Sequence, residues 1–407
     1  MTAHALAQAV EIATTAFAVA GMCYFLASIA AARVFLHNRR SPKPAFAPAV
    51  TILKSLKGLD PGMMDAFRSH STQNYAGEFE LLFGVSSMDD PSVAAVKQLQ
   101  GEFPERSIRL VLCLERLGTN GKVSTLAQLV SHARYDFLLI NDSDISVTPR
   151  YLERVMCCFA SVAQDAAKLE VGLVTALYRG KPYKSDSRGA GLPSRLESLG
   201  IATEFMPGVL LSKMIEGGLH YGLGSTLAVR RGALDKIGGL LPLVDYLADD
   251  YELGARMANA GYRIEVSAEV VETAIPAYAW SGFFDHQLRW LRTVRCSRPA
   301  GYLGLIVTHG IGWALVNVLA SGVSPLSLWL LALSFFLRLA QAMTVGAAVL
   351  ADHDVLPSLW LLPLRDVIAM ALWVAGFASD TIVWRGERFT LKDGKLAPQS
   401  PPRPEPL

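Results

Sequence analysis

The amino-terminal part of the sequence contains an apolar run, Ile12 to Phe35, with no charged residue before Arg33. As a helix, such a run is long enough to cross the roughly 30 Å of hydrocarbon in a bilayer. No basic segment precedes it and no clear cleavage site follows it, so we expect an anchor rather than a removed signal peptide. The stretch LHNRRSPKP follows, and basic residues after a first span favour the cytoplasmic side. Residues 1–45 are therefore predicted to form a transmembrane anchor with a basic linker, and the domain after it is expected in the cytoplasm.

The carboxyl-terminal part of the chain is apolar as well, with hydrophobic segments at about Leu303–Leu319, Leu326–Leu350 and Leu359–Phe377. Only 18% of all residues are charged, below the roughly 25% of an average soluble domain, which fits a protein with several membrane segments. Just before them, FFDHQLRWLRTVRC combines apolar residues with several arginines, which is typical of a helix lying in the membrane interface. The sequence therefore predicts an interfacial helix in residues 281–300 and membrane segments in residues 301–380.

The basic stretch WRGERFTLKDGK after these segments constrains the number of crossings. Three full crossings would place it outside, against the preference of basic residues for the cytoplasmic side. Arg338 and the Arg365–Asp366 pair also interrupt the apolar segments, where charges are costly unless they face protein or the interface. We expect two crossings and one interfacial or re-entrant segment, with a cytoplasmic basic and Pro-rich tail over residues 381–407. The predicted location is a multi-pass position in the bacterial inner membrane, with the central domain facing the cytoplasm.

Between the apolar ends, residues 46–280 alternate short aliphatic runs with helix-like stretches. The runs AVTILKSL, FELLFGVSS, IRLVLCL, YDFLLIND and VGLVTALY are predicted strands, and PSVAAVKQLQGEF and KVSTLAQLVSHA are predicted helices. This alternation indicates an α/β domain with a mostly parallel sheet covered on both faces. Ligands of such domains bind beyond the carboxyl ends of the strands, so polar residues there are the first candidates for a site.

Charge and cysteine content exclude other kinds of site. The formal net charge is only +2, and no basic run is interleaved with aromatic residues, which argues against a nucleic-acid partner. The five cysteines form no C-x-x-C pair, so neither a disulfide framework nor a zinc site is predicted.

The stretch NDSD follows one of the predicted buried strands and carries Asp142 and Asp144. In an extended chain, residues two apart project to the same side, so the two carboxylates converge and repel each other. A divalent cation such as Mg²⁺ or Mn²⁺ removes that repulsion, and it commonly completes its coordination with substrate phosphates. The alternative is structural: Asp142 forms an Asx turn and Asp144 caps a following helix.

Two further acids, Asp249 and Asp250, stand in LADDY at the start of a predicted amphipathic helix. Negative charge at a helix amino terminus is favourable in itself, which is one interpretation of both residues. The other is that one of the carboxylates, with its pKa raised by its surroundings, serves as a general base.

Two cationic elements complete the set of candidates. Arg289 offers a planar fork for diphosphate oxygens and Trp290 a flat face for a sugar, although both residues also suit an anchor at the lipid boundary. Lys122 lies between a predicted strand and helix, where it could contact a phosphate or simply be a solvated lysine.

These elements occur in an order that resembles a family 2-type glycosyltransferase, in particular the branch of ceramide glucosyltransferases and their bacterial relatives of hopanoid biosynthesis. Any one match is weak, but eight in register span about Thr51 to Phe389. The matching stretches are TILKSLKGLD, FGVSSMDDP, NGKVSTL, NDSDI, GSTLAVRRGALDKIGG, LADDY, HQLRW and WRGERF.

The resemblance implies a GT-A (Rossmann-like) catalytic domain that transfers a sugar from a nucleotide sugar with metal dependence and inversion. On that pattern Asp142 and Asp144 match the metal motif, and Asp250 matches the catalytic base. Asp90 looks like the aspartate that contacts the nucleotide, and Lys54 would lie near the uracil.

The Q/R-x-x-R-W motif of such enzymes ends here in Arg289 and Trp290, but its first position is His286, which puts the diphosphate role of that position in doubt. Ser55 likewise stands where a proline is common after the strand lysine. With these parts, Lys122 and the metal would neutralise the leaving UDP, and Asp249 would be an accessory residue beside the base.

The membrane segments favour a lipid acceptor, because a soluble acceptor would need neither an interfacial helix nor flanking spans. The stretch GYLGLIVTH resembles the hopanoid-associated group, which favours transfer of N-acetylglucosamine from UDP-GlcNAc to a hopanoid polyol. The alternative is a ceramide glucosyltransferase that uses UDP-glucose. A processive polysaccharide synthase would need several more spans, and a non-enzymatic membrane protein would not need intact acids at 142, 144 and 250.

Overall fold

The computed structural model describes residues 3–41, 44–162, 169–183, 191–384 and 387–398. It consists of two compact units. The first, here called the helical unit, comprises Met1–Arg40, Lys184–Ile215 and Ala277–Glu387; the second, the sheet unit, comprises Ser41–Tyr183, Glu216–Pro276 and Arg388–Leu407. Residues 184–215 lie within the range 46–280 predicted for the catalytic domain, yet they belong to the helical unit.

Three helices of the helical unit are long and apolar enough to cross a membrane among the described residues: Ala5–Arg39, Pro325–Val349 and Leu356–Ala375. A fourth apolar stretch is broken, since Pro299–Thr308 and Gly310–Ala320 meet at 56°. Such a break fits either a bent span or a re-entrant segment. It falls in the segment predicted at Leu303–Leu319, while the number of crossings and the side of the tail remain predictions.

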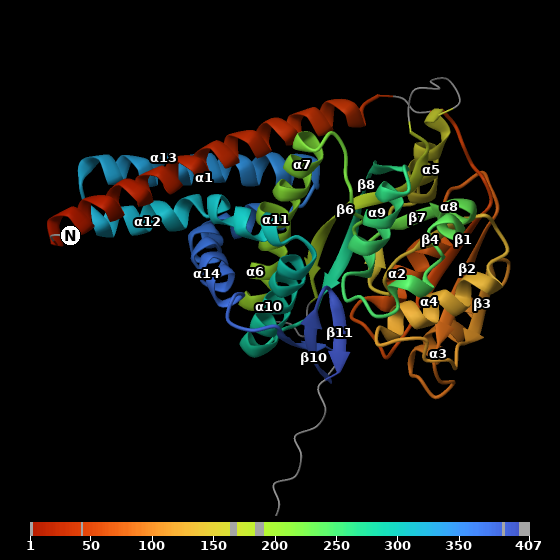
Figure 1. The fold of residues 1–407 in the computed structure, drawn as a ribbon. Coiled ribbons are helices and arrows are strands. Elements are labelled where there is room, and N and C mark those ends of the chain that lie inside the picture. Colours follow the sequence, from red (N-terminus) through yellow and green to blue (C-terminus); the bar gives the residue numbers. More distant parts are fainter. Residues whose placement is uncertain (1–2, 42–43, 163–168, 184–190, 385–386, 399–407) are drawn as a thin grey trace, which may run out of the picture. The chain divides into compact units, whose positions relative to one another are not determined.

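The helices of this unit follow one another in the chain as Figure 1 shows. Their bounds are α1 Ala3–Arg39, α6 Leu192–Gly200, the π-helical turn η2 Ile201–Phe205, α7 Met206–Ile215, α10 Trp280–Ser297, α11 Pro299–Gly304, η4 Leu305–Thr308, α12 Gly310–Ala320, α13 Pro325–Ala342, η5 Met343–Val349, η6 Leu356–Leu361 and α14 Leu362–Ala375, followed by the short strand β9 Thr381–Trp384. The predicted helix at 283–296 is confirmed as α10, and its position in the membrane interface remains a prediction.

The charges within the apolar segments face protein, as expected. Arg338 on α13 donates to the Asp366 carboxylate on α14 at 2.6 and 2.9 Å. The same guanidinium donates to Gln341 Oε1 at 2.5 Å and to the Thr203 carbonyl of η2. Arg338 and Asp366 are only 3% and 7% exposed, so this pair joins three elements inside the unit.

The sheet unit is built on an eight-stranded sheet of order β3-β2-β1-β4-β7-β6-β8-β5. Neighbours β1–β2, β2–β3, β1–β4 and β6–β8 are parallel, whereas β7 runs antiparallel to β4 and β6, and β5 runs antiparallel to β8. The predicted parallel sheet is therefore mixed at its centre. The strands are β1 Val50–Ser55, β2 Phe79–Val85, β3 Ser107–Leu112, β4 Phe137–Ile140, β5 Ile145–Ser146, β6 Val171–Pro182, β7 Leu227–Arg230 and β8 Arg263–Ile275.

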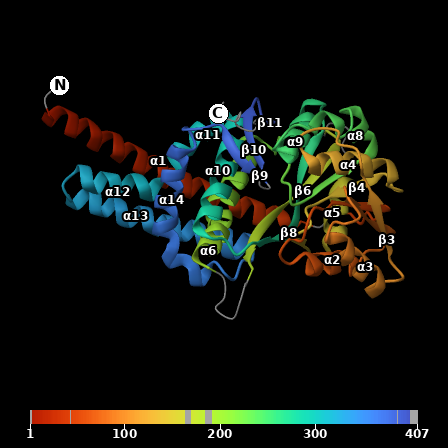
Figure 2. The same cartoon turned by 90° about the horizontal axis from the view of Figure 1, so that it is seen from below.

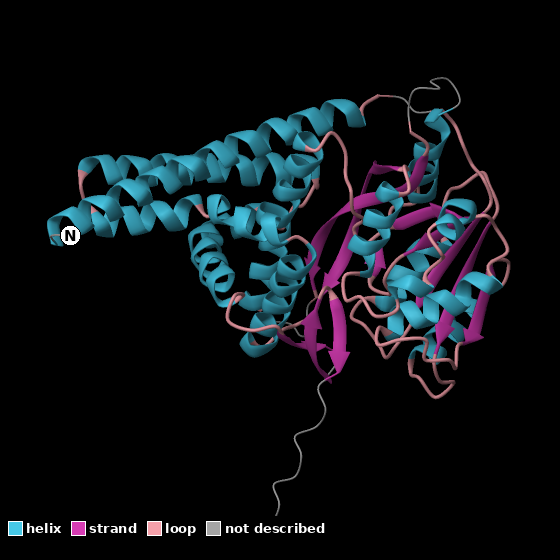
Figure 3. Ribbon diagram, in the orientation of Figure 1, coloured by secondary structure: helices cyan, strands magenta, loops and turns pink. Residues whose placement is uncertain are grey.

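Helices cover this sheet and complete its core (Figure 3). Phe67 of α2 and Val96 of α3 are fully buried against Ile52 and Phe83 of the strands, while α4 packs on β1 and β2. The bounds are α2 Met63–Ser71, α3 Ser92–Glu102, α4 Gly121–His132, α5 Tyr151–Met156, η1 Cys157–Val162, α8 Arg231–Lys236, η3 Leu241–Leu243 and α9 Asp249–Asn259.

The register of the parallel strands β1, β2 and β4 places the loops that follow them next to one another. Val50 of β1 lies beside Phe79 of β2 and Phe137 of β4 in parallel ladders, so the carboxyl ends of these strands share one edge of the sheet. The loops after β1, β2 and β4 carry Gly58, Asp90 and the NDSD stretch respectively.

Part of the predicted tail is ordered structure. Residues Glu387–Lys392 form β10 and Lys395–Pro398 form β11, an antiparallel hairpin. The Pro-rich end, residues 399–407, lies outside the described residues.

Candidate active site

Lys122 joins two of the predicted acidic elements. It lies in the first turn of α4, whose amino-terminal cap Asn120 accepts a hydrogen bond from the Val123 amide. Lys122 Nζ is 2.8 Å from Asp142 Oδ1 and 3.3 Å from Asp249 Oδ2. Burial by itself would lower the pKa of Lys122, but the two carboxylates outweigh it and raise the pKa. The ammonium group is thus ion-paired and mostly buried, and the interpretation of Lys122 as a solvated lysine is wrong.

A lysine side chain from strand β1 holds the NDSD loop in place. Lys54, 1% exposed at the end of β1, donates from Nζ to the Asp142 carbonyl at 2.8 Å. Burial lowers the pKa of Lys54 to about 7, although Asp142 and Asp144 act in the opposite direction. In this structure the lysine positions the loop that carries the two acids.

Asp144 lies half-buried in the same loop. Burial first, and the nearby Asp142 carboxylate second, raise the pKa of Asp144 to about 6. Its Oδ2 accepts a hydrogen bond from the Thr273 hydroxyl on β8, and the chain continues into β5 rather than into a helix. The alternative of a helix cap at Asp144 is therefore wrong.

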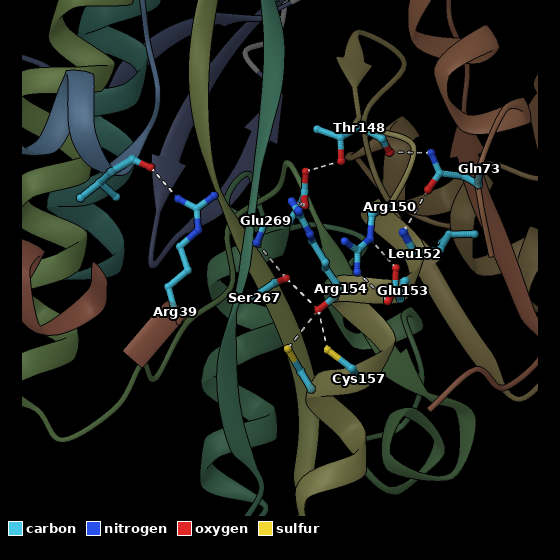
Figure 4. Close-up of polar contacts among 12 residues, drawn as sticks. Arg39, Gln73, Thr148, Arg150, Leu152, Glu153, Arg154, Cys157, Ser267 and Glu269 are labelled. Carbon is cyan, nitrogen blue, oxygen red and sulfur yellow. Dashed lines mark hydrogen bonds and ion pairs between the residues drawn. The ribbon is translucent and has the colours of Figure 1, made fainter. Parts of the chain in front are cut away.

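A polar network around the buried Glu269 fixes the chain just after the NDSD loop (Figure 4). Glu269 of β8 is 1% exposed and accepts from Thr148 Oγ1 at 2.6 Å and from Arg154 Nη1 at 2.7 Å. Gln73 donates to the Thr148 carbonyl at 2.8 Å and accepts from the Leu152 amide at 3.0 Å. The NDSD loop is thus fixed at two points, by the Lys54 hydrogen bond to Asp142 and by the contacts of Thr148 in this network.

Asp250 lies in the first turn of α9, so it does meet the favourable end of the helix dipole. Its Oδ2 accepts from the Gly224 amide at 2.7 Å and its Oδ1 from the Tyr251 amide at 2.8 Å. Burial and the neighbouring Asp249 raise the pKa of Asp250 to about 6. A carboxylate oriented by two amides, with its pKa near neutrality, is suited to general-base chemistry.

Sequence reasoning missed the residues that position these groups. A side chain built on Gly224 would place its Cβ 3.1 Å from Asp250 Oδ2, so any larger residue would crowd the carboxylate that this amide contacts. The segment before α9 is fixed by Asp245, which accepts from the Thr119 amide at 2.9 Å, and by Tyr246, whose carbonyl accepts from Asn120 Nδ2 at 2.8 Å. The GSTL and NGK matches contain Gly224 and Asn120 and were the available signal.

The carboxyl-terminal hairpin also supports this segment. The Leu396 amide of β11 donates to the Asp245 carbonyl at 2.8 Å, and the Leu247 amide donates to the Gly394 carbonyl at 3.2 Å. Lys395 Nζ lies 5.3 Å from the centre of the Tyr246 ring. The hairpin thus packs on the three residues that lead into Asp249 and Asp250.

The acids fit a metal that is completed by substrate. No group of three or more His, Cys, Asp or Glu side chains among the described residues is arranged to hold a metal ion. Asp142 and Asp144 supply two carboxylates. The Asp60 carboxylate accepts a hydrogen bond from Ser143 Oγ, and its negative charge contributes to the raised pKa of Asp144. Two carboxylates plus substrate phosphates are a common environment for Mg²⁺, so this donor set fits a cation that binds together with a nucleotide.

Of the other predicted residues, Asp90 lies in the loop after β2, at the same edge of the sheet, and the rest lie on α10. The Asp90 carboxylate accepts from the Gly58 amide at 3.0 Å and from Ser92 Oγ at 2.6 Å, which pins the loop after β1. His286, Arg289 and Trp290 lie on α10 of the helical unit. There the ring of His286 packs 4.8 Å from that of Trp290.

Comparison with known proteins identifies the chain. The model of glycosyl transferase family 21 matches residues 13–397. The protein belongs to glycosyl transferase family 21. Within this family it resembles "Ceramide glucosyltransferase 3" of Caenorhabditis elegans, with 25% identity over 94% of this chain and 82% of that protein. "Ceramide glucosyltransferase 1" of the same organism is 23% identical over 88% of this chain and 75% of that protein.

The fold of this family 21 member agrees with a solved structure. A mannosyltransferase from Pyrobaculum calidifontis, in complex with GDP-Man and Mn²⁺, superposes with a TM-score of 0.52 at 18% identity over 91% of this chain and 98% of that one. The predicted GT-A fold is thereby confirmed. Membership of the family makes the protein a glycosyltransferase, in agreement with the predicted hexosyltransferase.

Proposed function

We propose that this family 21 protein is a membrane lipid glycosyltransferase that moves one hexose from a UDP-sugar to a lipid hydroxyl, with inversion. The observation that carries the proposal is the arrangement in which Lys122 joins Asp142 to Asp249, next to Asp250. The predicted membrane spans and the similarity to ceramide glucosyltransferases support a lipid acceptor.

In this proposal Asp250 takes the proton from the acceptor hydroxyl as the oxygen attacks the anomeric carbon. Its two amide donors keep the carboxylate oriented and leave one lone pair on each oxygen free for that proton. Lys122 supplies positive charge for the leaving diphosphate. Asp142 and Asp144 would hold Mg²⁺ or Mn²⁺, which neutralises charge on the same diphosphate.

Two combinations of sugar donor and lipid acceptor are open to this enzyme. The two relatives that match most of the chain favour glucose as the sugar and ceramide as the acceptor. The stretch GYLGLIVTH, residues 301–309, favours N-acetylglucosamine and a hopanoid polyol. We propose glucose transfer to a ceramide-type lipid as the first version to test, because its support extends over most of the chain.

Membranes from cells that express the protein would be incubated with labelled UDP-glucose or UDP-GlcNAc, a ceramide or a hopanoid polyol, and Mn²⁺ or Mg²⁺. Mass spectrometry of the extracted lipids is expected to show one added hexose on ceramide, dependent on the metal and absent with EDTA. An added N-acetylhexosamine on the polyol would establish the second version. No glycosylated lipid under any combination would contradict the proposed function.

A further inference from the structure

A buried polar cluster in the helical unit surrounds Arg365 of α14. The helices α6, α10 and α14 pack against one another around it (Figure 2). Arg365, 4% exposed, donates from Nη2 to Gln287 Oε1 of α10 at 2.9 Å. The same Nη2 is 2.8 Å from Glu204 Oε2 of the π-helical turn η2. We call Glu197, Glu204, Gln287 and Arg365 the Arg365 cluster.

Several polar atoms of this cluster have no partner. Within the part of the chain that the structure describes, Arg365 Nε, Arg365 Nη1 and Glu197 Oε2 are buried without a hydrogen bond. An unsatisfied buried polar group costs about 1–3 kcal/mol, and more when the group is charged. The cluster is therefore incomplete until another group supplies donors and acceptors.

The neighbouring Arg338 is an arginine of the same unit whose hydrogen-bond donors all have acceptors. Each of its three nitrogens donates to an oxygen of Asp366, Gln341 or Thr203. Arg338 is buried to the same extent as Arg365, and its contacts are all within the protein. Arg365 differs in that two of its nitrogens point to no acceptor.

The backbone of α6 and η2 comes close to the Arg365 side chain. Glu204 lies in a π-helical turn, a rare element that is frequent at functional sites. A Cβ on Gly200 would lie 2.5 Å from Arg365 Nε, so the absence of a side chain there leaves room for the guanidinium. The Glu204 side chain is 26% exposed, so the cluster reaches the surface of the unit at this residue.

The charges of the cluster select its ligand. Glu197 and Glu204 are acids and Arg365 is the one base of the cluster. His286 of α10, 3.0 Å from Glu197 Oε1, could at most bring the sum to zero. An anionic phosphate would meet two carboxylates for one guanidinium, whereas a neutral group with hydroxyl or amide donors and acceptors complements all the unpartnered atoms.

We propose that the Arg365 cluster binds the uncharged hydroxyl- and amide-bearing headgroup of the lipid acceptor. The inference rests on the proposed function and adds the residues that recognise the acceptor. Glu197 and Glu204 accept from the headgroup donors, and Arg365 Nε and Nη1 donate to its oxygens. A ceramide offers an amide and two hydroxyls, and a hopanoid polyol offers hydroxyls, so both sources carry this chemistry.

The test measures apparent KM values of the full-length protein for a short-chain ceramide, for a hopanoid polyol and for the UDP-sugar. Glu204→Gln keeps the size of a partly exposed side chain, and Arg365→Lys removes the two unpartnered guanidinium nitrogens. Each variant is expected to raise the KM for the accepted lipid about ten-fold, as loss of one hydrogen bond to a charged group would. The KM for the UDP-sugar is expected to stay within about two-fold, because Lys122, Asp142 and Asp250 lie on other elements.

The matched control is Arg195→Met. Arg195 also joins α6 to the chain before α14, through Pro357 O at 3.3 Å and Ser358 Oγ at 3.2 Å, but it contributes no unpartnered atom. Both KM values should remain within about two-fold of wild type in this control. An unchanged acceptor KM in Glu204→Gln, or equal increases in both KM values, would overturn the proposal.

Thermal unfolding in the presence of each lipid provides a measurement without turnover. The wild-type protein should be stabilised by the lipid it accepts, and Glu204→Gln should lose most of that shift. A wild-type protein that is stabilised by a lipid but transfers no sugar to it would contradict the proposed function alone. Equal shifts in wild type and Glu204→Gln would contradict the binding site alone.

Discussion

Asp250 is the residue on which the chemistry depends most. Replacing it by Asn keeps the size of the side chain and one of its two acceptor oxygens but removes the proton acceptor. We expect Asp250→Asn to lower the transfer rate by at least about 10²-fold, the usual contribution of a general base, while binding of the UDP-sugar changes little. Asp235→Asn, at an exposed position of α8, should leave both quantities near wild type. Transfer at the wild-type rate in Asp250→Asn would remove this residue as the base.

The raised pKa of Asp250 gives a pH dependence. A base must be ionised, and a carboxyl whose pKa lies at about 6 is mostly ionised at pH 7 and mostly protonated at pH 5. The transfer rate should therefore fall about ten-fold from pH 7 to pH 5. Binding of UDP with Mn²⁺ at the same pH values separates this effect from titration of Asp144. A flat rate over this range would contradict the assignment.

At the level of single residues, the sequence allowed prediction of the acids and of Lys122, because each stands at a strand end or helix start. It did not reveal what holds them. Gly224 and Asp245 act through hydrogen bonds to other segments of the chain, and the GSTL match marks Gly224 without showing that its amide reaches a carboxylate.

At the level of elements, the NDSD loop depends on the pair formed by Glu269 and Arg154. Glu269→Gln would leave the Arg154 guanidinium without its buried charge partner, so we expect a loss of about 2 kcal/mol in the free energy of unfolding. The measurement is thermal unfolding of the detergent-solubilised protein. The control is Glu153→Gln, which removes an exposed pair with Arg150 and should cost less than about 0.5 kcal/mol. Equal stability of the two variants would show that the buried network does not support the loop.

The predicted strands at the start of the domain correspond to β1, β2, β3, β4 and β6, and the predicted helices to α3 and α4. These elements have strong local patterns with clear hydrophobic periodicity. The antiparallel insertion of β7 and the β10–β11 hairpin were not predicted, because pairing direction and tertiary packing are not local properties. The hairpin sequence is polar and predicts a tail, yet its contacts with residues 245–247 make it part of the sheet unit.

At the level of the whole molecule, the chain combines a sheet unit that carries Lys122 and the acids of the candidate site with a helical unit that carries the candidate membrane spans and the Arg365 cluster. Each unit has its own buried charges, satisfied around Glu269 in one and incomplete around Arg365 in the other. This division matches the two substrates of the proposed reaction, a polar nucleotide sugar and an amphipathic lipid.

The most direct test of the central claim is the anomeric configuration of the sugar in the lipid product. Wild-type protein would be supplied with UDP-glucose, in which the sugar is α-linked, and with ceramide, and the purified product examined by proton NMR. A single displacement assisted by Asp250 predicts a β-linked hexosyl lipid. An α-linked product, or no hexosyl lipid at all with an active preparation, would contradict the account.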